Sequence, residues 1–191
     1  YEPVIDNPSV DCVAIVAVSL TSGRQPFFLS KRFEIHRQML ELSEPCIQDR
    51  TIYEDKEIFA ETLYRQGFMS ERDHTNCGAL FDAMTSFLRA PDLIVYLRAN
   101  VDTLIERIRC RGRDCEREIS TDYLEALNNA YESWIAGAQD MTRVLTIETD
   151  ALDLVSDDSA IERVLEEIVA GLGQAVGSPV PLELGAGAAT P

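Results

Sequence analysis

Short apolar runs alternating with helical periodicity are the feature that most constrains the fold of this chain. Three runs, at residues 45–48, 93–97 and 144–147, have the length and β-branched content of buried parallel strands. Apolar residues recur between them at the i, i+3, i+4, i+7 spacing of a helix with one buried face, as at residues 77–84, 101–108 and 161–168. Strands alternating with helices predict an α/β fold with a parallel sheet.

The ends of the expected helices carry capping signals. Ser159 followed by Glu162 has the spacing of a capping box and predicts the start of the last helix, and Ser70 with Asp73 is a looser version. The chain from Gly173 onward is rich in Gly, Ala and Pro without a period. We therefore expect one domain over residues 1–172 and a disordered tail over 173–191.

Charge and cysteine content limit the partners. The 191 residues carry a formal net charge of −16, which repels phosphate backbones and anionic lipid, so neither nucleic acid nor a membrane is an expected partner. Any bound phosphate then needs a local cluster of arginines. Five cysteines without a C-x-x-C pair indicate reduced thiols, and we expect a cytoplasmic protein.

An acidic and a basic residue, Asp49 and Arg50, directly follow the first expected strand. Ligands of open α/β sheets bind beyond the carboxyl ends of the strands. A carboxylate there can hold Mg²⁺, and a guanidinium can hold a phosphate or a hydroxyl. The alternative is a surface ion pair at a helix start, where the macrodipole favours an acid.

Five arginines gather in "ERIRCRGRDCERE", residues 106–118, in an otherwise acidic chain. Arg107 and Arg111 share a helix face at i, i+4, and Gly112 then ends the helix in a loop that carries Arg113. Such an element could close over phosphates and neutralise their charge during transfer. The alternative is a solvated face whose charge the neighbouring acids balance.

These motifs, in this order, resemble the deoxynucleoside kinases, and specifically their bacterial deoxyadenosine/deoxyguanosine kinase branch. The resemblance runs through "YEPVIDNP", "QPFFLSKRF", "IQDRTIYEDKEIFAETLY", "PDLIVYLRANVDTLIERIRCRGR", "ISTDYLEALNNAYESWI" and "IETDALDLV". It implies a P-loop NTPase-like fold, a parallel sheet flanked by helices. It also implies that ATP, with Mg²⁺, phosphorylates the 5′-hydroxyl of a deoxynucleoside.

The resemblance implies roles at the phosphate end of the site. Glu2 matches the carboxylate that takes the proton of the 5′-hydroxyl. Asp49 is similar to the magnesium-site acid, and Arg50 to the arginine that holds the 5′-oxygen and nearby phosphate. The arginines that match those of the lid are Arg107, Arg111 and Arg113.

The resemblance also implies residues that bind the nucleoside and the adenine of ATP. Gln25, Arg32 and Asp55 match the set that reads the base, and Glu116 matches the carboxylate that binds the sugar 3′-hydroxyl. The residues near the adenine-contacting loop are Asp153 and Leu154. Most aromatic residues, including Tyr131 and Trp134 on one expected helix stripe, are interpreted as packing, and the two histidines receive no role.

Two departures from the family pattern stand out. The chain has no G-x-x-x-x-G-K-[ST], the loop that cradles phosphates after the family's first strand. We therefore expect a fragment that lacks the central P-loop strand and is inactive by itself. Residues 9–24 have the family's length but not its aromatic residues, which suggests a shifted reading frame or weak substrate binding.

Two further functions stay open from the sequence. One is a noncatalytic remnant that binds nucleosides or forms dimers. The other is a thymidylate-type nucleotide kinase, although its monophosphate acceptor would favour an arginine where this chain has Glu2. Among deoxyadenosine, deoxyguanosine and deoxycytidine the sequence does not choose. The resemblance implies a homodimer through helices near "HRQMLEL" and "ALFDAMTSFL".

Overall fold

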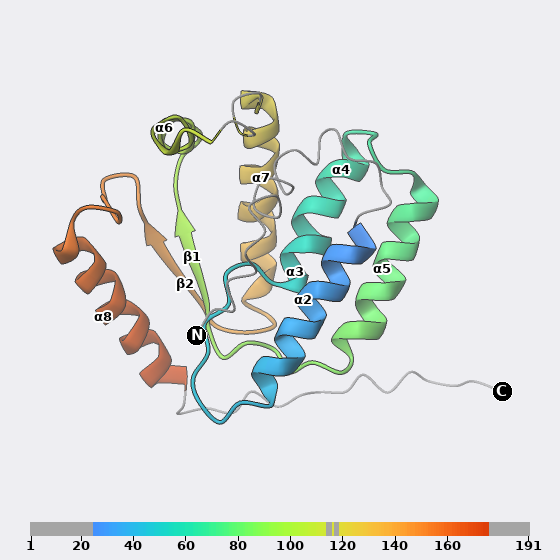
Figure 1. Ribbon diagram of the computed structural model, residues 1–191, viewed down its shortest axis with the longest axis horizontal. Coiled ribbons are helices and arrows are strands. Elements are labelled where there is room, and N and C mark those ends of the chain that lie inside the picture. The colour runs from blue at the N-terminus through green and yellow to red at the C-terminus, as the bar shows by residue number, and fades with distance from the viewer. Residues whose placement is uncertain (1–24, 114–115, 117–118, 176–191) are drawn as a thin grey trace.

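A two-stranded parallel sheet lies between helices α8 and α7, α6 lies beyond the end of the strands, and helices α2 to α5 extend from the α7 side (Figure 1). The computed structural model describes residues 25–113, 116 and 119–175. The described elements, in chain order, are α2 (Gln25–Leu40), α3 (Ile52–Glu54), the π-helix η3 (Asp55–Ala60), α4 (Glu61–Arg65), α5 (Glu71–Thr85), β1 (Ile94–Arg98), α6 (Val101–Arg111), α7 (Thr121–Ala138), β2 (Val144–Glu148) and α8 (Asp158–Ala175).

The sheet confirms two of the three predicted strands. β1 and β2 pair in parallel, with Ile94 opposite Val144 and Arg98 opposite Glu148. A parallel pair needs a long crossover, and here α6 and α7 supply it. Both strands end on the side where α6 begins (Figure 1). The loops after β1 and β2 therefore lie together, which is where an α/β sheet binds its ligands.

The prediction of a strand at residues 45–48 was wrong. This segment forms no strand in the described structure, and Ile47 is 91% exposed, the opposite of a buried strand. A strand exists only where a neighbour takes its backbone hydrogen bonds. Among the described strands, β1 and β2 pair only with each other, so residues 45–48 have no partner strand.

The main apolar core lies among the helices rather than at the sheet. Helix α2 packs against α5 and η3, and α7 packs against η3 from another side. Trp134 of α7 packs on this core, which confirms its predicted role in packing. The buried residues of the core are Leu29, Ile52, Tyr53, Ala60, Leu63, Met69, Cys77 and Phe81.

The helix ends follow local hydrogen bonding. Ser70 accepts from Asp73 N at 3.2 Å at the start of α5, as predicted. At α8 the prediction was wrong, because Asp157 takes the role expected of Ser159: its Oδ1 accepts from Ser159 N at 3.0 Å. An acid directly before the first helical residue is an equally good acceptor for these amides. Gly112 ends α6 with φ of 67°, the left-handed conformation that favours glycine.

Several predictions fall on other parts of the chain. Glu2 and the atypical stretch 9–24 lie outside the described residues, as do residues 176–191 of the expected tail. Helix α8 runs to Ala175, past the predicted domain end at residue 172. None of the helices in the described ranges is long and apolar enough to cross a bilayer.

Candidate active site

The turn between residue 48 and α3 holds Arg50 in an unusual backbone conformation. Arg50 has φ of 58°, and it is the only residue other than glycine in the described ranges with positive φ. This conformation costs of order 1–3 kcal/mol for such a residue, so the surroundings must hold it in place. Part of that support comes from α2, where Arg32 Nη1 donates to the carbonyl oxygen of Asp49 at 2.9 Å.

The Arg50 side chain extends toward η3 and α7. Its guanidinium lies over the ring of Phe59, with Cζ 5.2 Å from the ring centroid. Its positive charge lowers the pKa of Asp55 and of two α7 tyrosines, Tyr123 and Tyr131, in each case against a larger upward effect of burial. Arg50 therefore links the turn before α3 to both η3 and α7.

Asp55, the first residue of η3, is a buried acid with an unused acceptor. It is 6% exposed, and within the described structure its Oδ2 has no hydrogen-bond partner. Its pKa is raised to about 7, chiefly by burial and also by the charge of Glu54, against the opposite effect of Arg32 and Arg50. π-Helical turns are rare and occur often at functional sites. An unsatisfied buried carboxyl costs stability, which is a reason to look for a ligand that completes it.

The predicted base-reading residues are brought together as far as the structure describes them. Arg32 on α2 acts electrostatically on Asp55 of η3, across the packed interface of the two helices. Gln25 is the first residue of α2, and its side chain lies outside the described part. One cluster thus contains Arg32, Asp49, Arg50 and Asp55, although Arg32 lies on α2, well before the other three residues in the chain.

The predicted lid loop holds a second buried carboxylate. Glu116 is 2% exposed, and Arg111 donates to its Oε2 from both Nε (3.0 Å) and Nη2 (2.7 Å). Arg113 Nη1 lies 3.5 Å from Oε1, which has no hydrogen-bond partner in the described structure. Two arginines of the cluster seen in the sequence, Arg111 and Arg113, therefore contact the same buried carboxylate.

Arg107 makes a different connection, to the loop after β2. Nη1 donates to Thr149 Oγ1 at 2.9 Å, and Nη2 donates to the carbonyl oxygens of Thr149 and, at 3.2 Å, Leu152. Asp153 Oδ1 accepts from the backbone N–H of Val155 and Ser156, and these bonds lower its pKa. Arg107 thus ties α6 to the loop that carries Asp153 and Leu154.

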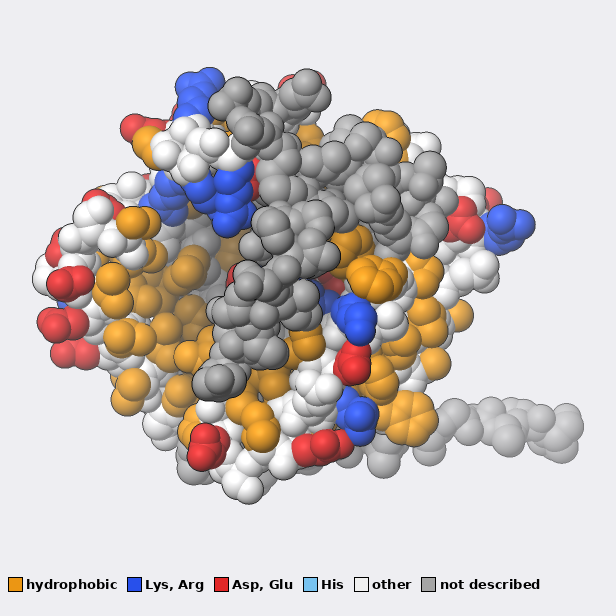
Figure 2. Space-filling model, in the orientation of Figure 1, with side chains coloured by type: hydrophobic (Ala, Val, Ile, Leu, Met, Phe, Trp, Pro, Cys, Tyr) orange, Lys and Arg blue, Asp and Glu red, His pale blue; other side chains and the backbone are white. Residues whose placement is uncertain are grey.

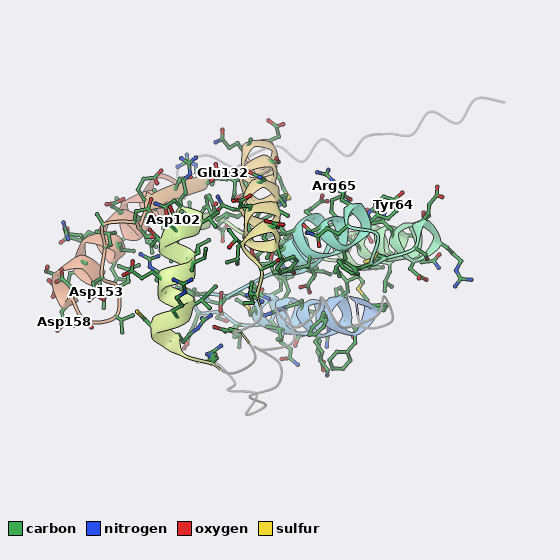
Figure 3. The ribbon with its side chains drawn as sticks, turned by 90° about the horizontal axis from the view of Figure 1, so that it is seen from above. Tyr64, Arg65, Asp102, Glu132, Asp153 and Asp158 are labelled. Carbon is green, nitrogen blue, oxygen red and sulfur yellow. The ribbon has the colours of Figure 1, made fainter. Side chains whose placement is uncertain are left out.

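Helix α6, which carries the predicted lid arginines, follows the carboxyl end of β1. Figure 2 shows lysine and arginine side chains gathered over α6, at the edge of a hollow lined by hydrophobic side chains. In Figure 3, α6 lies between α8, which begins near Asp153 and Asp158, and α7, which carries Glu132. A groove of about 500 Å³ that includes Leu93 and Gly171 lies at the opposite, amino ends of the strands.

The acidic side chains of the cluster show whether this site could hold Mg²⁺. The described residues contain no group of three or more metal-binding side chains. Mg²⁺ does not require one, because it is usually held by one or two carboxylates together with waters and substrate phosphates. The exposed carboxylate of Asp49, next to Arg50, is compatible with that mode of binding.

Comparison with known proteins gives the family. The model of the deoxynucleoside kinase family matches residues 21–172. The chain belongs to this family. A deoxyadenosine/deoxycytidine kinase of Bacillus subtilis is 35% identical over 146 residues, covering 75% of this chain and 67% of that protein. A deoxyadenosine kinase of Dictyostelium discoideum is 37% identical over 147 residues, covering 77% of this chain and 58% of that protein.

Solved structures agree with the family and with the P-loop NTPase-like α/β fold. A deoxyadenosine kinase from M. mycoides, solved with the products dCMP and a flexible dCDP, matches with a TM-score of 0.71 and 26% identity. The match covers 89% of this chain and 84% of that one. The same kinase with dATP bound matches with a TM-score of 0.70.

Sequence reasoning missed two residues of the site. Tyr131 was interpreted as packing, yet its hydroxyl donates to Glu54 Oε1 at 3.0 Å. Glu54 was not singled out, although its Oε2 accepts from Thr51 N at 2.6 Å. A signal was present, because a tyrosine in an apolar helix stripe usually has a hydrogen-bond partner for its hydroxyl.

Proposed function

We propose that this protein transfers the γ-phosphate of ATP to the 5′-hydroxyl of a deoxynucleoside. The observation that carries the proposal is the Arg32–Asp55 cluster beside Arg50, in a chain whose family is the deoxynucleoside kinases. The residues divide into a base-binding part, a phosphate-binding part and a lid.

The base is bound by Asp55, Arg32 and Gln25. Asp55 offers a buried carboxyl oxygen without a partner, and Arg32 offers guanidinium N–H groups on the neighbouring helix. An ionised carboxylate accepts, and a guanidinium only donates, so together they complement a base edge that presents both kinds of group. The exocyclic amino group of adenine, guanine or cytosine is the donor that Asp55 would accept from.

Arg50 holds the 5′-oxygen and the transferred phosphate. Phosphoryl transfer depends mostly on alignment and charge stabilisation, so a guanidinium held in one place contributes in the transition state. Its contact with Phe59 and its strained backbone both restrict where the charge can lie. In this proposal Glu2 accepts the proton of the 5′-hydroxyl as the oxygen attacks phosphorus.

The lid arginines and Glu116 complete the site. Arg111 and Arg113 neutralise charge on the phosphates, and Glu116 accepts from the sugar 3′-hydroxyl through Oε1, which has no hydrogen-bond partner among the described residues. Arg107 fixes the loop of Asp153 and Leu154 against α6, where the adenine of ATP would lie. Asp49 would hold Mg²⁺, which when bound reduces the negative charge on the phosphates.

We further propose a cytoplasmic homodimer. The helices named by the family resemblance, α2 and α5, pack on each other and leave large apolar side chains exposed near their ends. Leu40 is 43%, Leu42 60% and Phe87 77% exposed. A second copy that covers them would remove this apolar surface from water.

An assay of phosphate transfer tests the proposed function. The chain as printed, and the same chain extended to the nearest upstream in-frame start codon, receive ATP, Mg²⁺ and deoxyadenosine, deoxyguanosine, deoxycytidine or thymidine 5′-monophosphate. We expect transfer to at least one nucleoside by the extended chain and its loss in Arg50→Ala. Transfer to the monophosphate alone would support a thymidylate-type kinase. No transfer by either folded chain would support a noncatalytic remnant.

A further inference from the structure

Glu54 connects two parts of the site that the proposed roles do not join. One carboxylate oxygen, Oε2, accepts from Thr51 N at 2.6 Å, and the other, Oε1, accepts from the Tyr131 hydroxyl at 3.0 Å. Thr51 directly follows Arg50 in the chain, whereas Tyr131 lies on α7. A single side chain thus spans the gap between the turn and the neighbouring helix.

The bond to Thr51 acts on the peptide unit next to the strained residue. Arg50 has φ of 58°, and this conformation persists only when the groups around it hold it. Thr51 is the N-cap of α3 with extended backbone, so its N–H lies outside the helix and needs an acceptor. The Glu54 carboxylate is that acceptor, and it carries charge, which strengthens the bond.

The bond to Tyr131 fixes Glu54 in turn. The ring of Tyr131 stacks on that of Tyr96 in β1, with centroids 6.0 Å apart and planes 8° apart, so the hydroxyl is carried by a rigid support. Burial raises the pKa of Tyr131, and the negative charge of Glu54 raises it further, so the hydroxyl stays a donor at neutral pH. The two tyrosines have different acceptors, because the Tyr96 hydroxyl donates to Glu132 Oε1 at 3.1 Å.

We propose that Tyr131 and Glu54 are positioning residues that hold the Arg50 turn in its phosphate-binding conformation. Tyr131 fixes the Glu54 carboxylate, the carboxylate fixes the peptide after Arg50, and the guanidinium is thereby aimed at the 5′ end of the nucleoside. Neither side chain needs to touch substrate. The inference rests on the proposed function, because it takes Arg50 as the residue that holds the 5′-phosphate.

The inference predicts a loss of binding affinity only for ligands that carry a 5′-phosphate. In the proposed function Arg50 binds the 5′ group and not the base, so loosening its turn should weaken binding of a deoxynucleoside 5′-monophosphate and spare the deoxynucleoside. Calorimetry with deoxyadenosine, deoxyguanosine, deoxycytidine and their 5′-monophosphates gives the ratio of the two affinities for each pair. A loss of stability alone would lower both affinities together and leave the ratio unchanged.

Three variants and a matched control make the test specific. We expect Tyr131→Phe to lower the monophosphate-to-nucleoside affinity ratio by about fivefold, the typical net effect of one intramolecular hydrogen bond. Glu54→Ala should lower it at least as much, and Glu54→Gln, which keeps an acceptor, should lower it less. The control Tyr96→Phe removes the other hydroxyl of the stacked pair and should leave the ratio unchanged.

The outcomes separate the inference from the proposed function. An unchanged ratio in both Tyr131→Phe and Glu54→Ala would overturn the inference while the proposed function stood, provided that Arg50→Ala lowers the ratio. If Tyr96→Phe lowered the affinity ratio as much as Tyr131→Phe does, the inference would also be overturned, because the effect would then come from disturbing the stacked rings. If the unsubstituted chain, also after extension upstream, binds none of the six ligands, both the proposed function and the inference are refuted.

Discussion

Replacement of Asp55 by asparagine should stabilise the protein at neutral pH and not in acid. Asp55 is 6% exposed, and burial raises its pKa from 3.8 to about 7. The unfolded chain therefore loses this proton near pH 3.8, and the folded protein keeps it until about pH 7. Between these values the folded state binds more protons, so the free energy of unfolding falls as the pH rises.

The size of this effect follows from the shift. Each pKa unit corresponds to about 1.4 kcal/mol, so ionised Asp55 costs about 4 kcal/mol above pH 7 relative to pH values below 3.8. Asp55→Asn carries no charge and does not incur this cost. A changed hydrogen bond of the amide would add an offset of about 1 kcal/mol that does not vary with pH. The quantity to measure is therefore the change in the difference between variant and wild type from pH 4 to pH 8.

Urea unfolding, followed by the fluorescence of Trp134 at several pH values, measures this difference. We expect the variant to gain stability relative to the wild type by up to about 4 kcal/mol as the pH rises from 4 to 8. Asp153→Asn is the control of opposite sign, because two backbone N–H groups lower the pKa of Asp153 and favour its charge. A stability difference for Asp55→Asn that stays constant with pH would refute the reasoning.

Other changes test separate parts of the structure. Gly112→Ala should lower the free energy of unfolding by about 1 kcal/mol because φ is 67° there, whereas Gly78→Ala, inside α5 with open space around it, should raise it by up to about 1 kcal/mol; thermal unfolding compares the two. Arg107→Ala should speed hydrogen exchange at residues 149–152, measured by mass spectrometry, with exchange at η3 unchanged. Glu116→Ala should cost about 2–3 kcal/mol, since Arg111 loses its buried acceptor and Arg113 its ion-pair partner, and an unchanged urea midpoint would contradict this.

Periodicity correctly predicted helices at residues 77–84, 101–108 and 161–168, because a helix satisfies its own backbone hydrogen bonds. The apolar stripe of α6 and the breaker Gly112 are local signals, and both are confirmed. The strand at residues 45–48 was wrong because a strand depends on a neighbour that local sequence does not specify, and Ile47 is exposed as a result. The sequence analysis misplaced the start of α8 because Asp157 and Ser159 are both good N-cap residues, and the sequence does not show which of them accepts from the first helical amides.

The sequence identified candidate residues for the site but not the contacts between them. Family resemblance named Arg32 and Asp55, but the burial of Asp55 arises from helices packed around η3. The arginines near Gly112 were visible as a cluster, yet their acceptors, Glu116 for Arg111 and Thr149 for Arg107, lie at separations that spacing does not determine. The helix stripe indicated that the Tyr131 hydroxyl needs a partner, but Glu54 is far from it in the chain, so no local pattern could identify that partner.

The central claim is that the cluster around Asp55 binds the base of a deoxynucleoside. The most direct test is an NMR titration of the Asp55 carboxyl carbon, with and without saturating deoxyadenosine, deoxyguanosine or deoxycytidine. We expect a pKa of about 7 in the free protein and a clear fall with the preferred nucleoside, because an amino group that donates to Oδ2 favours the ionised form. An Asp55 pKa that stays the same when a nucleoside is bound would contradict the account.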